Sequence, residues 1–372
     1  MIYLDNAATS YPKPKTVIDE VKRCLEEYCG NAGRSGHRMS IISAEKIYSA
    51  RENLCSHLSF DFPERVVFTY NATYALNLAI RALINENDEV LISDLEHNSV
   101  VRPLELLKKE KNIDYKIFST EKDIQKNIES LISKKTKAII STLSSNVTGK
   151  SISASVLSCV ARKYGLKLIL DASQALGHEN ISLSNLCFDA LCGPGHKGLF
   201  GIQGSGFVVF GNEKPNAPFI AGGSGSESRS LNMPRFLPDR YEAGTLSTPA
   251  IASLNEGISF IDNLGIKEVA FKENMLANRL KEGLSLIKGT KLYDTEGAIV
   301  LFNFKGKESE ELCSKFDRFG IYTRGGLHCS PLAHKSLKTE KSGALRLSVS
   351  YFNTLQEIDV FLNIANKIAA EC

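Results

Sequence analysis

Short apolar runs separated by amphipathic stretches are the feature that most restricts the fold of this chain. Most of the runs are continuously apolar rather than alternating, as is typical of strands covered on both faces. Helical patterns such as ISASVLSCVARKYG (152–165) lie between them, so the sequence predicts an α/β fold with a seven-stranded, mainly parallel sheet. The expected strands are VVFT (66–69), EVLISD (89–94), YKIFST (115–120), KAIIST (137–142), KLILD (167–171), FDALC (188–192) and GFVVFG (206–211).

The pattern changes after about residue 250. Long helical patterns over 249–264 and 266–288 lead into the short segments AIVLFNFKG, GIYTRGG and ALRLSVS, which predict a small α+β unit. The glycine- and serine-rich AGGSGSESRS (221–230) predicts a loop rather than a domain linker, because compact patterns resume soon after it.

Composition excludes several classes of function. The net charge of the 372 residues is only +3, which argues against nucleic-acid or anionic-membrane partners, and no apolar run approaches the length of a membrane span. The N-terminal MIYLDNAATSYPKPK lacks the apolar core of a signal peptide. Nine cysteines without CxxC spacing indicate reduced thiols rather than disulfides or a metal site. We therefore expect a cytoplasmic protein without a metal.

Polar residues follow five of the expected strands at the point where each strand ends. In an open parallel sheet these ends form the crevice where ligands bind, so the residues are expected to converge. Each of them alone has an ordinary structural explanation, such as a helix cap or a turn. They are Asn71 and Thr73 with Ala72 between them, then His97, then Asn146, then Asp171 with Gln174, and finally His196 with Lys197.

The set matches the needs of a phosphorylated pyridine aldehyde. Its phosphate requires a helix N-terminus and a hydroxyl, which NATYALN with Thr73 supplies. Its ring nitrogen requires a carboxylate such as Asp171, its ring face a flat partner such as His97, and its aldehyde an amine such as Lys197. The glycines around this lysine, in LCGPGHKGLFGIQG (191–204), are expected to make room for the cofactor.

The sequence resembles cysteine desulfurases of the NifS/SufS kind, which have the class V aminotransferase fold and include selenocysteine lyases. The resemblance covers essentially the whole chain and rests on YLDNAATS, EHNS, DASQ, GHKG, YEAGT, RGGLHC and RLSVSYFNT. It implies pyridoxal 5'-phosphate and a fold type I architecture. It also implies a large cofactor-binding domain over 15–250 and a small domain formed by 1–14 plus 251–372.

The resemblance also implies individual roles. Lys197 would bond to the cofactor aldehyde as a Schiff base, and Arg346 would clamp the substrate carboxylate with its bidentate fork. Thr245 would reach the phosphate in the neighbouring subunit of a homodimer. The remaining cofactor contacts would be Asp171 at the ring nitrogen, Gln174 at the ring hydroxyl, His97 on the ring face, Asn146 near the ring hydroxyl and substrate, and Thr73 and His196 at the phosphate.

Three positions in two motifs depart from the family pattern. Pro194 stands where relatives commonly carry Ser or Thr, and proline cannot donate to a phosphate. Asn71 and Ala72 stand where many relatives carry Thr and Gly. Both departures concern the phosphate ligands and leave the lysine unaffected.

Cys329 selects among the reactions that this fold supports. It follows His328 in the glycine-rich, polar loop RGGLHCSPLAH and matches the cysteine that carries the persulfide in the family. We expect L-cysteine, or L-selenocysteine, to be converted to alanine while Cys329 takes the sulfur as a thiolate, helped by His328 or the cofactor site. The short loop resembles the SufS-like group, which implies a separate sulfur-acceptor protein.

Three alternatives remain open at this point. The same scaffold supports an aminotransferase or a selenocysteine lyase. A sulfur-relay or scaffold protein could keep the fold without the cofactor. A zinc enzyme using His328, Cys329 and His334 would need a fourth ligand at suitable spacing, and the sequence offers none.

Overall fold

The computed structural model describes residues 1–33, 36–212, 218 and 220–370. Its strands are β1 (Ile2–Tyr3), β2 (Val66–Thr69), β3 (Glu89–Ser93), β4 (Asp114–Phe118), β5 (Thr136–Thr142), β6 (Lys167–Asp171), β7 (Ala190–Pro194), β8 (Gly206–Phe210), β9 (Thr290–Leu292), β10 (Ile299–Phe304), β11 (Ile321–Tyr322) and β12 (Leu345–Ser348). Its helices are α1 (Lys15–Arg23), α2 (Arg38–His57), α3 (Ala72–Leu83), α4 (Asn98–Lys111), α5 (Ile124–Leu131), α6 (Ala154–Tyr164), α7 (Thr248–Leu264), α8 (Ile266–Ser285), α9 (Ser309–Asp317), α10 (Pro331–Ser336) and α11 (Leu355–Ala370).

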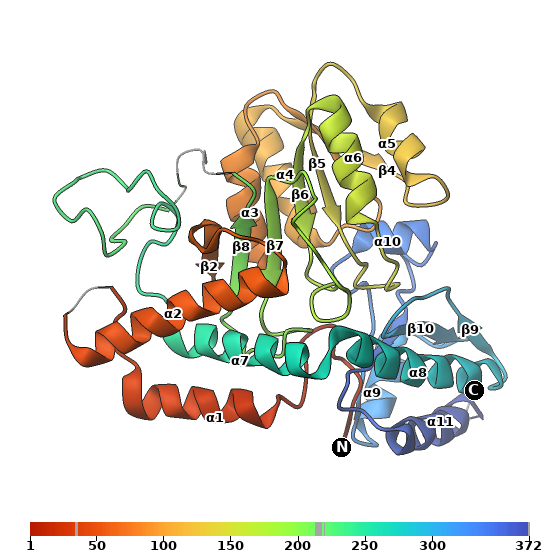
Figure 1. The fold of residues 1–372 in the computed structure, drawn as a ribbon. Coiled ribbons are helices and arrows are strands. Elements are labelled where there is room, and N and C mark those ends of the chain that lie inside the picture. Colours follow the sequence, from red (N-terminus) through yellow and green to blue (C-terminus); the bar gives the residue numbers. More distant parts are fainter. Residues whose placement is uncertain (34–35, 213–217, 219, 371–372) are drawn as a thin grey trace.

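The central sheet contains the seven strands that the sequence predicts. Its order is β2-β8-β7-β6-β5-β3-β4, and β8 alone runs antiparallel to its neighbours, β2 and β7. The other pairings are parallel. The prediction of an α/β fold with a mainly parallel seven-stranded sheet is confirmed (Figure 1). Because β3, β5 and β6 are parallel neighbours, their carboxyl ends meet at one edge of the sheet.

Helices cover both faces of this sheet, which explains why its strands are continuously apolar. One hydrophobic core forms where α3 and α4 pack on one face. A second core forms on the other face, where α2, α6 and α7 contribute buried side chains. Helix α7 also packs along α1 and α2, so residues just after 248 belong to this layer in space.

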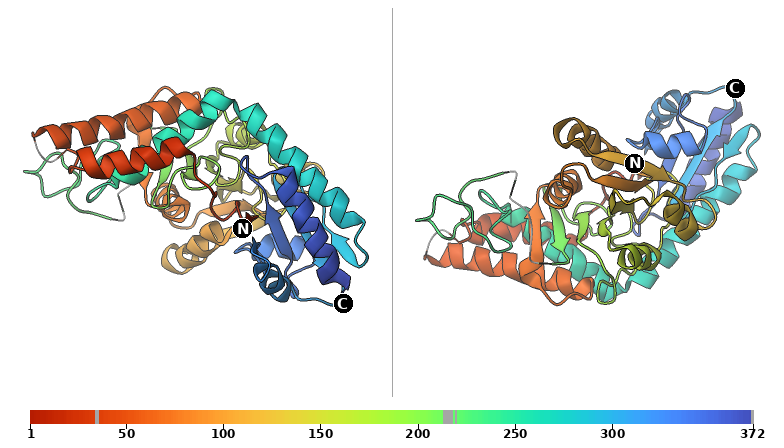
Figure 2. Two further views of the ribbon diagram at one scale, coloured as in Figure 1. Left: turned by 90° about the horizontal axis from the view of Figure 1, so that it is seen from below. Right: turned by 90° about the horizontal axis from the view of Figure 1, so that it is seen from above.

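The C-terminal part forms a smaller layer of its own. Strands β12, β10 and β9 form an antiparallel sheet, and α8, α9 and α11 enclose a third hydrophobic core with it. The N-terminal β1 pairs in parallel with β11, so the start of the chain belongs to this lobe. In Figure 2 the small lobe lies at the end of the molecule opposite to the loop that precedes α7.

Two details differ from expectation or add to it. The region after Cys329, expected as loop, forms the short helix α10, because Pro331 occupies its first turn, where a missing amide hydrogen has no cost. None of the helices in the described ranges combines the length and the hydropathy that a membrane crossing requires.

Candidate active site

A pocket of about 100 Å³ lies beyond the carboxyl ends of the central strands. It collects seven of the residues predicted for the cofactor: Thr73, His97, Asn146, Asp171, Gln174, His196 and Lys197. Cys329, Thr245 and Arg346 are not among the residues that line it. The convergence expected from the strand ends is therefore present, although the roles of the individual residues stay predictions.

Lys197 and Asp171 form the charged centre of the pocket. Asp171 ends β6, is only 3 % exposed and accepts a hydrogen bond from the Ser173 amide at 2.9 Å. Burial lowers the pKa of the Lys197 amine to about 8, although the Asp171 carboxylate opposes that shift. An amine with this pKa is partly neutral near pH 7, which a Schiff-base lysine requires.

The N-terminal segment holds the backbone around this lysine. The Ser10 hydroxyl donates to the Lys197 carbonyl at 2.9 Å, and the Lys13 ammonium donates to the His196 carbonyl at 2.8 Å. Residues far apart in sequence thus fix the point from which the Lys197 side chain enters the pocket.

The glycines near Lys197 do not make room for a cofactor, so that prediction was wrong. A Cβ atom on Gly198 would lie 2.1 Å from the Leu176 carbonyl oxygen and 2.8 Å from Nε2 of His178. Gly193 and Gly195 likewise face side chains of the protein rather than the pocket. The glycines let the loop after β7 pack closely against the loop after β6, and this packing places Lys197.

His97 is held by the start of α4. It is the N-cap of this helix, and its Nδ1 accepts from the Ser99 amide at 3.0 Å. Burial lowers its pKa to about 4, so the ring is neutral at pH 7. The Ser99 hydroxyl also contacts Nδ1 at 2.8 Å and the Thr73 hydroxyl at 2.7 Å. Ser99 was missed by the sequence reasoning, although it lies in the quoted motif EHNS.

The other end of the pocket has the character of an anion site. Thr73 lies in the first turn of α3, where the backbone amides have no acceptor within the helix and can donate to an anion. Nδ1 of His196 is buried without a partner among the described atoms, and burial lowers the pKa of this ring to about 4. Pro194, the departure from the family pattern, lines the same pocket.

Two predicted contacts are engaged with protein atoms. Asn146 donates to the His328 carbonyl at 2.8 Å and accepts from the Ser330 hydroxyl at 2.6 Å, so its amide holds the Cys329 loop. Gln174 donates to the Ala7 carbonyl at 3.0 Å. Their predicted contacts with the ring hydroxyl and substrate remain untested by this geometry.

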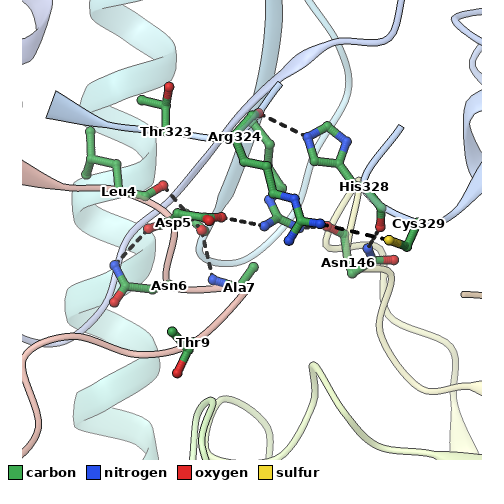
Figure 3. A network of polar contacts seen from close by, with 12 residues as sticks. Leu4, Asp5, Asn6, Ala7, Thr9, Asn146, Thr323, Arg324, His328 and Cys329 are labelled. Carbon is green, nitrogen blue, oxygen red and sulfur yellow. Dashed lines mark hydrogen bonds and ion pairs between the residues drawn. The ribbon is translucent and has the colours of Figure 1, made fainter. Parts of the chain in front are cut away.

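Cys329 is exposed on the small lobe, and its carbonyl accepts from the Asn98 amide, next to His97, at 2.8 Å. Nη2 of Arg324 lies 3.9 Å from the Cys329 sulfur (Figure 3). The His328 ring instead contacts His334 and the Arg324 carbonyl. This ring is buried and bonds to those two groups rather than to the Cys329 sulfur, so the expected help of His328 to the thiol involves no direct contact in this structure and stays a prediction.

Arg346 is almost fully buried in the small lobe. One of its terminal nitrogens pairs with Asp5 at 2.7 Å and the other donates to the Asn146 carbonyl at 2.7 Å. Its Nε is buried without a partner among the described atoms. Both arms of the fork thus contact protein here, and the predicted clamp on a substrate carboxylate stays a prediction.

Thr245 lies outside the pocket, beside the Tyr70 and Tyr74 side chains. Its hydroxyl accepts from Asn31 at 3.4 Å. Thr245 thus lies outside the cofactor pocket of its own chain, which is compatible with a role in the site of a neighbouring subunit.

Residues 2–361 match the family model described as aminotransferase class-V. The chain belongs to this family. Two probable cysteine desulfurases are similar to this class-V member over nearly its whole length. The one from Borreliella burgdorferi is 30 % identical and aligns with 100 % of this chain and 92 % of its own. The one from Pyrococcus abyssi is 28 % identical, with 99 % and 94 % covered.

A solved structure supports the same placement within the class-V family. The apo cysteine desulfurase from Thermococcus onnurineus superposes with a TM-score of 0.92 at 27 % identity, covering 100 % of this chain and 95 % of that one. The recognition of a NifS/SufS-like sequence and the fold type I architecture are thus confirmed.

The pocket fits the pyridoxal phosphate that the class-V family implies. The buried Asp171 carboxylate suits a protonated ring nitrogen, and the partly neutral Lys197 amine suits an aldehyde. The orphaned Nδ1 of His196 and the first turn of α3 suit a phosphate. Each chemical part of the cofactor thus has a matching group in this structure.

Proposed function

We propose that this protein is a pyridoxal-phosphate-dependent cysteine desulfurase that converts L-cysteine to L-alanine and leaves a persulfide on Cys329. The observation that carries the proposal is that the cofactor pocket and the Cys329 loop are held together by hydrogen bonds. A Lys197–Asp171–His97 pocket lies next to a loop that presents an exposed thiol, and the Asn98 amide and Asn146 side chain tie that loop to the pocket.

When bound, pyridoxal phosphate supplies an aldehyde that bonds to amines and a ring that withdraws electrons from the amino-acid α-carbon. Asp171 would accept a hydrogen bond from the ring nitrogen, and His97 would cover the ring face. Thr73, Ser99 and His196 would hold the phosphate. Nζ of Lys197 would bind the cofactor at rest and move the α-proton during turnover.

Cys329 takes the sulfur. Its thiolate attacks the sulfur of L-cysteine, so that the substrate C–S bond breaks as an S–S bond forms. L-cysteine and the enzyme thiol are consumed, and alanine and the enzyme persulfide are formed, so all atoms balance. The Arg324 guanidinium lies 3.9 Å from this sulfur.

The test measures alanine and the Cys329 persulfide together. The purified holoenzyme is exposed to L-cysteine, alanine is quantified, and peptide mass spectrometry locates any added sulfur. We expect one extra sulfur on Cys329, and a loss of at least about 100-fold in alanine formation in Cys329→Ser, because the serine hydroxyl cannot accept sulfur. Cys159→Ser, at another exposed thiol, is the matched control.

Other outcomes separate the alternatives. Transamination of L-cysteine would produce 3-mercaptopyruvate, which keeps its sulfur, without a persulfide on the enzyme. Turnover of L-selenocysteine that survives Cys329→Ser, while turnover of L-cysteine does not, would favour a selenocysteine lyase. A colourless protein with no borohydride-reducible adduct on Lys197 would favour a relay protein without cofactor and would refute the proposal.

Three further features belong to the proposal. The exposed position of Cys329 supports transfer of the persulfide to a separate acceptor protein. The position of Thr245 outside the pocket supports a homodimer in which each subunit completes its neighbour's site. The free state of the eight described cysteines supports a reducing, cytoplasmic location.

A further inference from the structure

A buried pair of histidines lies beneath the Cys329 loop and has no role in the chemistry above. His328 is 3 % exposed and His334, on α10, is fully buried. Their rings stack at an interplanar angle of 16°, and Nδ1 of His328 lies 3.0 Å from Nε2 of His334. Burying a histidine ring is costly unless its nitrogens form hydrogen bonds. The contact between these two rings satisfies one nitrogen of each and leaves the other two nitrogens to be satisfied by different partners.

The pair is part of a longer chain of hydrogen bonds with two different ends. Nε2 of His328 contacts the Arg324 carbonyl at 3.1 Å, and Nδ1 of His334 contacts the Thr339 hydroxyl at 2.8 Å. The Arg324 carbonyl oxygen can only accept. A hydroxyl can donate or accept.

The acceptor-only end fixes the direction of the whole chain when both rings are neutral. Nε2 of His328 must carry its proton, so its Nδ1 must accept from Nε2 of His334. Nδ1 of His334 is then an acceptor, and the Thr339 hydroxyl must donate to it. The Thr339 hydroxyl also lies 3.3 Å from the His334 carbonyl oxygen, but that oxygen already accepts from the Thr339 amide at 2.8 Å, and the hydroxyl is closer to Nδ1 of His334, at 2.8 Å.

The electrostatic surroundings keep both rings neutral at pH 7. Burial is the main cause that lowers the pKa of His334 to about 4 and the pKa of His328 well below its usual value. The Arg346 guanidinium adds to both shifts, and Arg324 adds to that of His328. Other charged or titratable groups near these hydrogen bonds and the thiol include Asp5 paired with Arg346, His97 and Lys197 in the pocket, Asp94 and Lys335 around α10, and Lys338 and Glu340 on either side of Thr339.

One end of this series of hydrogen bonds is Arg324, the residue whose side chain contacts the reactive thiol. The Arg324 carbonyl accepts from His328 and also from the Arg346 amide at 2.8 Å, which fixes the Arg324 backbone. From this fixed point the Arg324 guanidinium reaches the Cys329 sulfur (Figure 3). His328 and Cys329 both adopt left-handed backbone conformations, at φ 53° and 58°, so this loop needs outside support to persist.

We infer that Thr339, His334 and His328 are positioning residues that hold the Arg324 guanidinium beside Cys329 and thereby set how fast the Cys329 sulfur reacts. The inference deepens the proposed function and rests on it for the importance of Cys329. It states that the Thr339 hydroxyl, which is connected to the Arg324 carbonyl through the rings of His334 and His328, affects the reactivity of the Cys329 thiol.

The test compares Thr339→Val, which removes the hydroxyl at nearly constant volume, with Thr339→Ser, which keeps it. The holoenzyme is alkylated with iodoacetamide from pH 6 to 10 without any cysteine, and peptide mass spectrometry follows Cys329. We expect Cys329 in Thr339→Val to react about three- to tenfold more slowly at pH 7, and Cys329 in Thr339→Ser to react as in the unmodified protein. The exposed Cys29 and Cys159 provide internal controls whose rates stay constant.

Equal alkylation rates of Cys329 in Thr339→Val and the unmodified protein would overturn the inference, as would equal slowing in the valine and serine variants. In an Arg324→Gln background the valine change is expected to have no further effect, because its route to the thiol is already lost. A further slowing of similar size there would contradict the role of Arg324.

A measurement on the unmodified protein keeps the inference testable if Thr339→Val does not fold. Long-range NMR correlations on ¹⁵N-histidine-labelled holoenzyme at pH 7 report which ring nitrogen carries the proton. We expect the Nε2–H form for both His328 and His334, and an Nδ1–H form in either ring would refute the chain. Neither readout depends on desulfurase turnover, so failure here leaves the proposed function standing, and failure of the cysteine assay leaves these readouts intact.

Discussion

At the scale of single residues, the most consequential side chain is a buried amine. The pKa of Lys197 falls from its ordinary 10.5 to about 8 because burial disfavours the ammonium form. Between these two values the unfolded chain binds more protons than the folded one, so the stability of the cofactor-free protein rises with pH. The cost of burying this amine is fully present below pH 8 and disappears above pH 10.5. Lys197 therefore lowers the folding stability of the cofactor-free protein at neutral pH.

Replacing this lysine is expected to stabilise the cofactor-free protein. One pKa unit corresponds to about 1.4 kcal/mol, so Lys197→Met should raise the free energy of unfolding at pH 7 by roughly 1–3 kcal/mol. Urea denaturation at pH 7 and pH 10 measures this, and the gain should shrink at the higher pH. Lys15→Met, at a side chain that is 85 % exposed, is the control and should change little. A less stable Lys197→Met protein at both pH values would contradict the expectation.

The sequence identifies residues whose roles depend on local position. Lys197, Asp171 and His97 could be predicted because each follows a strand, and parallel strands end at one edge. Arg324 and Ser99 could not, because their importance depends on which way a side chain turns within a loop. The Asp5–Arg346 pair was also missed, since its partners lie 341 residues apart and no periodicity links them.

At the scale of elements, the fold was predictable and the packing of its loops was not. Continuous apolar runs predict buried strands whatever their neighbours are. The reason for the glycines around Lys197 could not be predicted, because it depends on which atoms face each glycine in the folded structure. Gly177, with φ 79°, and Gly198 bring the loops after β6 and β7 into backbone contact, because a Cβ on Gly177 would lie 2.2 Å from the Gly198 carbonyl oxygen.

We expect Gly198→Ala to disturb this loop contact and displace Lys197. The new methyl group overlaps backbone atoms, which typically costs about 1–3 kcal/mol of folding stability. Cofactor absorbance should fall along with the melting temperature. Gly36→Ala is the matched control, because a Cβ there meets no atom within 4 Å. Full cofactor occupancy in Gly198→Ala would show that the close contact is dispensable.

At the scale of the whole molecule, the open question is how many chains build one site. The proposed division into a large domain over 15–250 and a small domain of 1–14 plus 251–372 has α7 at its junction, where this helix packs along α1 and α2. Thr245 lies just before α7, beside Asn31 and outside the cofactor pocket. If each subunit completes its neighbour's site, a defect in one chain can be compensated by the other.

Mixed dimers test this arrangement. Lys197→Ala and Thr245→Val are each expected to bind cofactor poorly alone. After the two variants are unfolded and refolded together, half of the dimers contain one chain of each kind, and in these one site has both residues intact. We therefore expect cofactor binding to recover at about a quarter of all sites, measured by absorbance. No recovery, with mixed dimers confirmed by mass, would place Thr245 in the site of its own chain.

The pairing of β1 with β11 has a consequence for the order of assembly. Residues 2–13 bond to positions more than three hundred residues later in the small lobe and also brace the carbonyls of His196 and Lys197. Contacts of such long range form late, because a large loop must close before they contribute. A polypeptide still emerging from the ribosome would therefore lack the support of residues 2–13 around Lys197 until β11 had been made, so the amine would be placed for chemistry only after the small lobe had begun to fold.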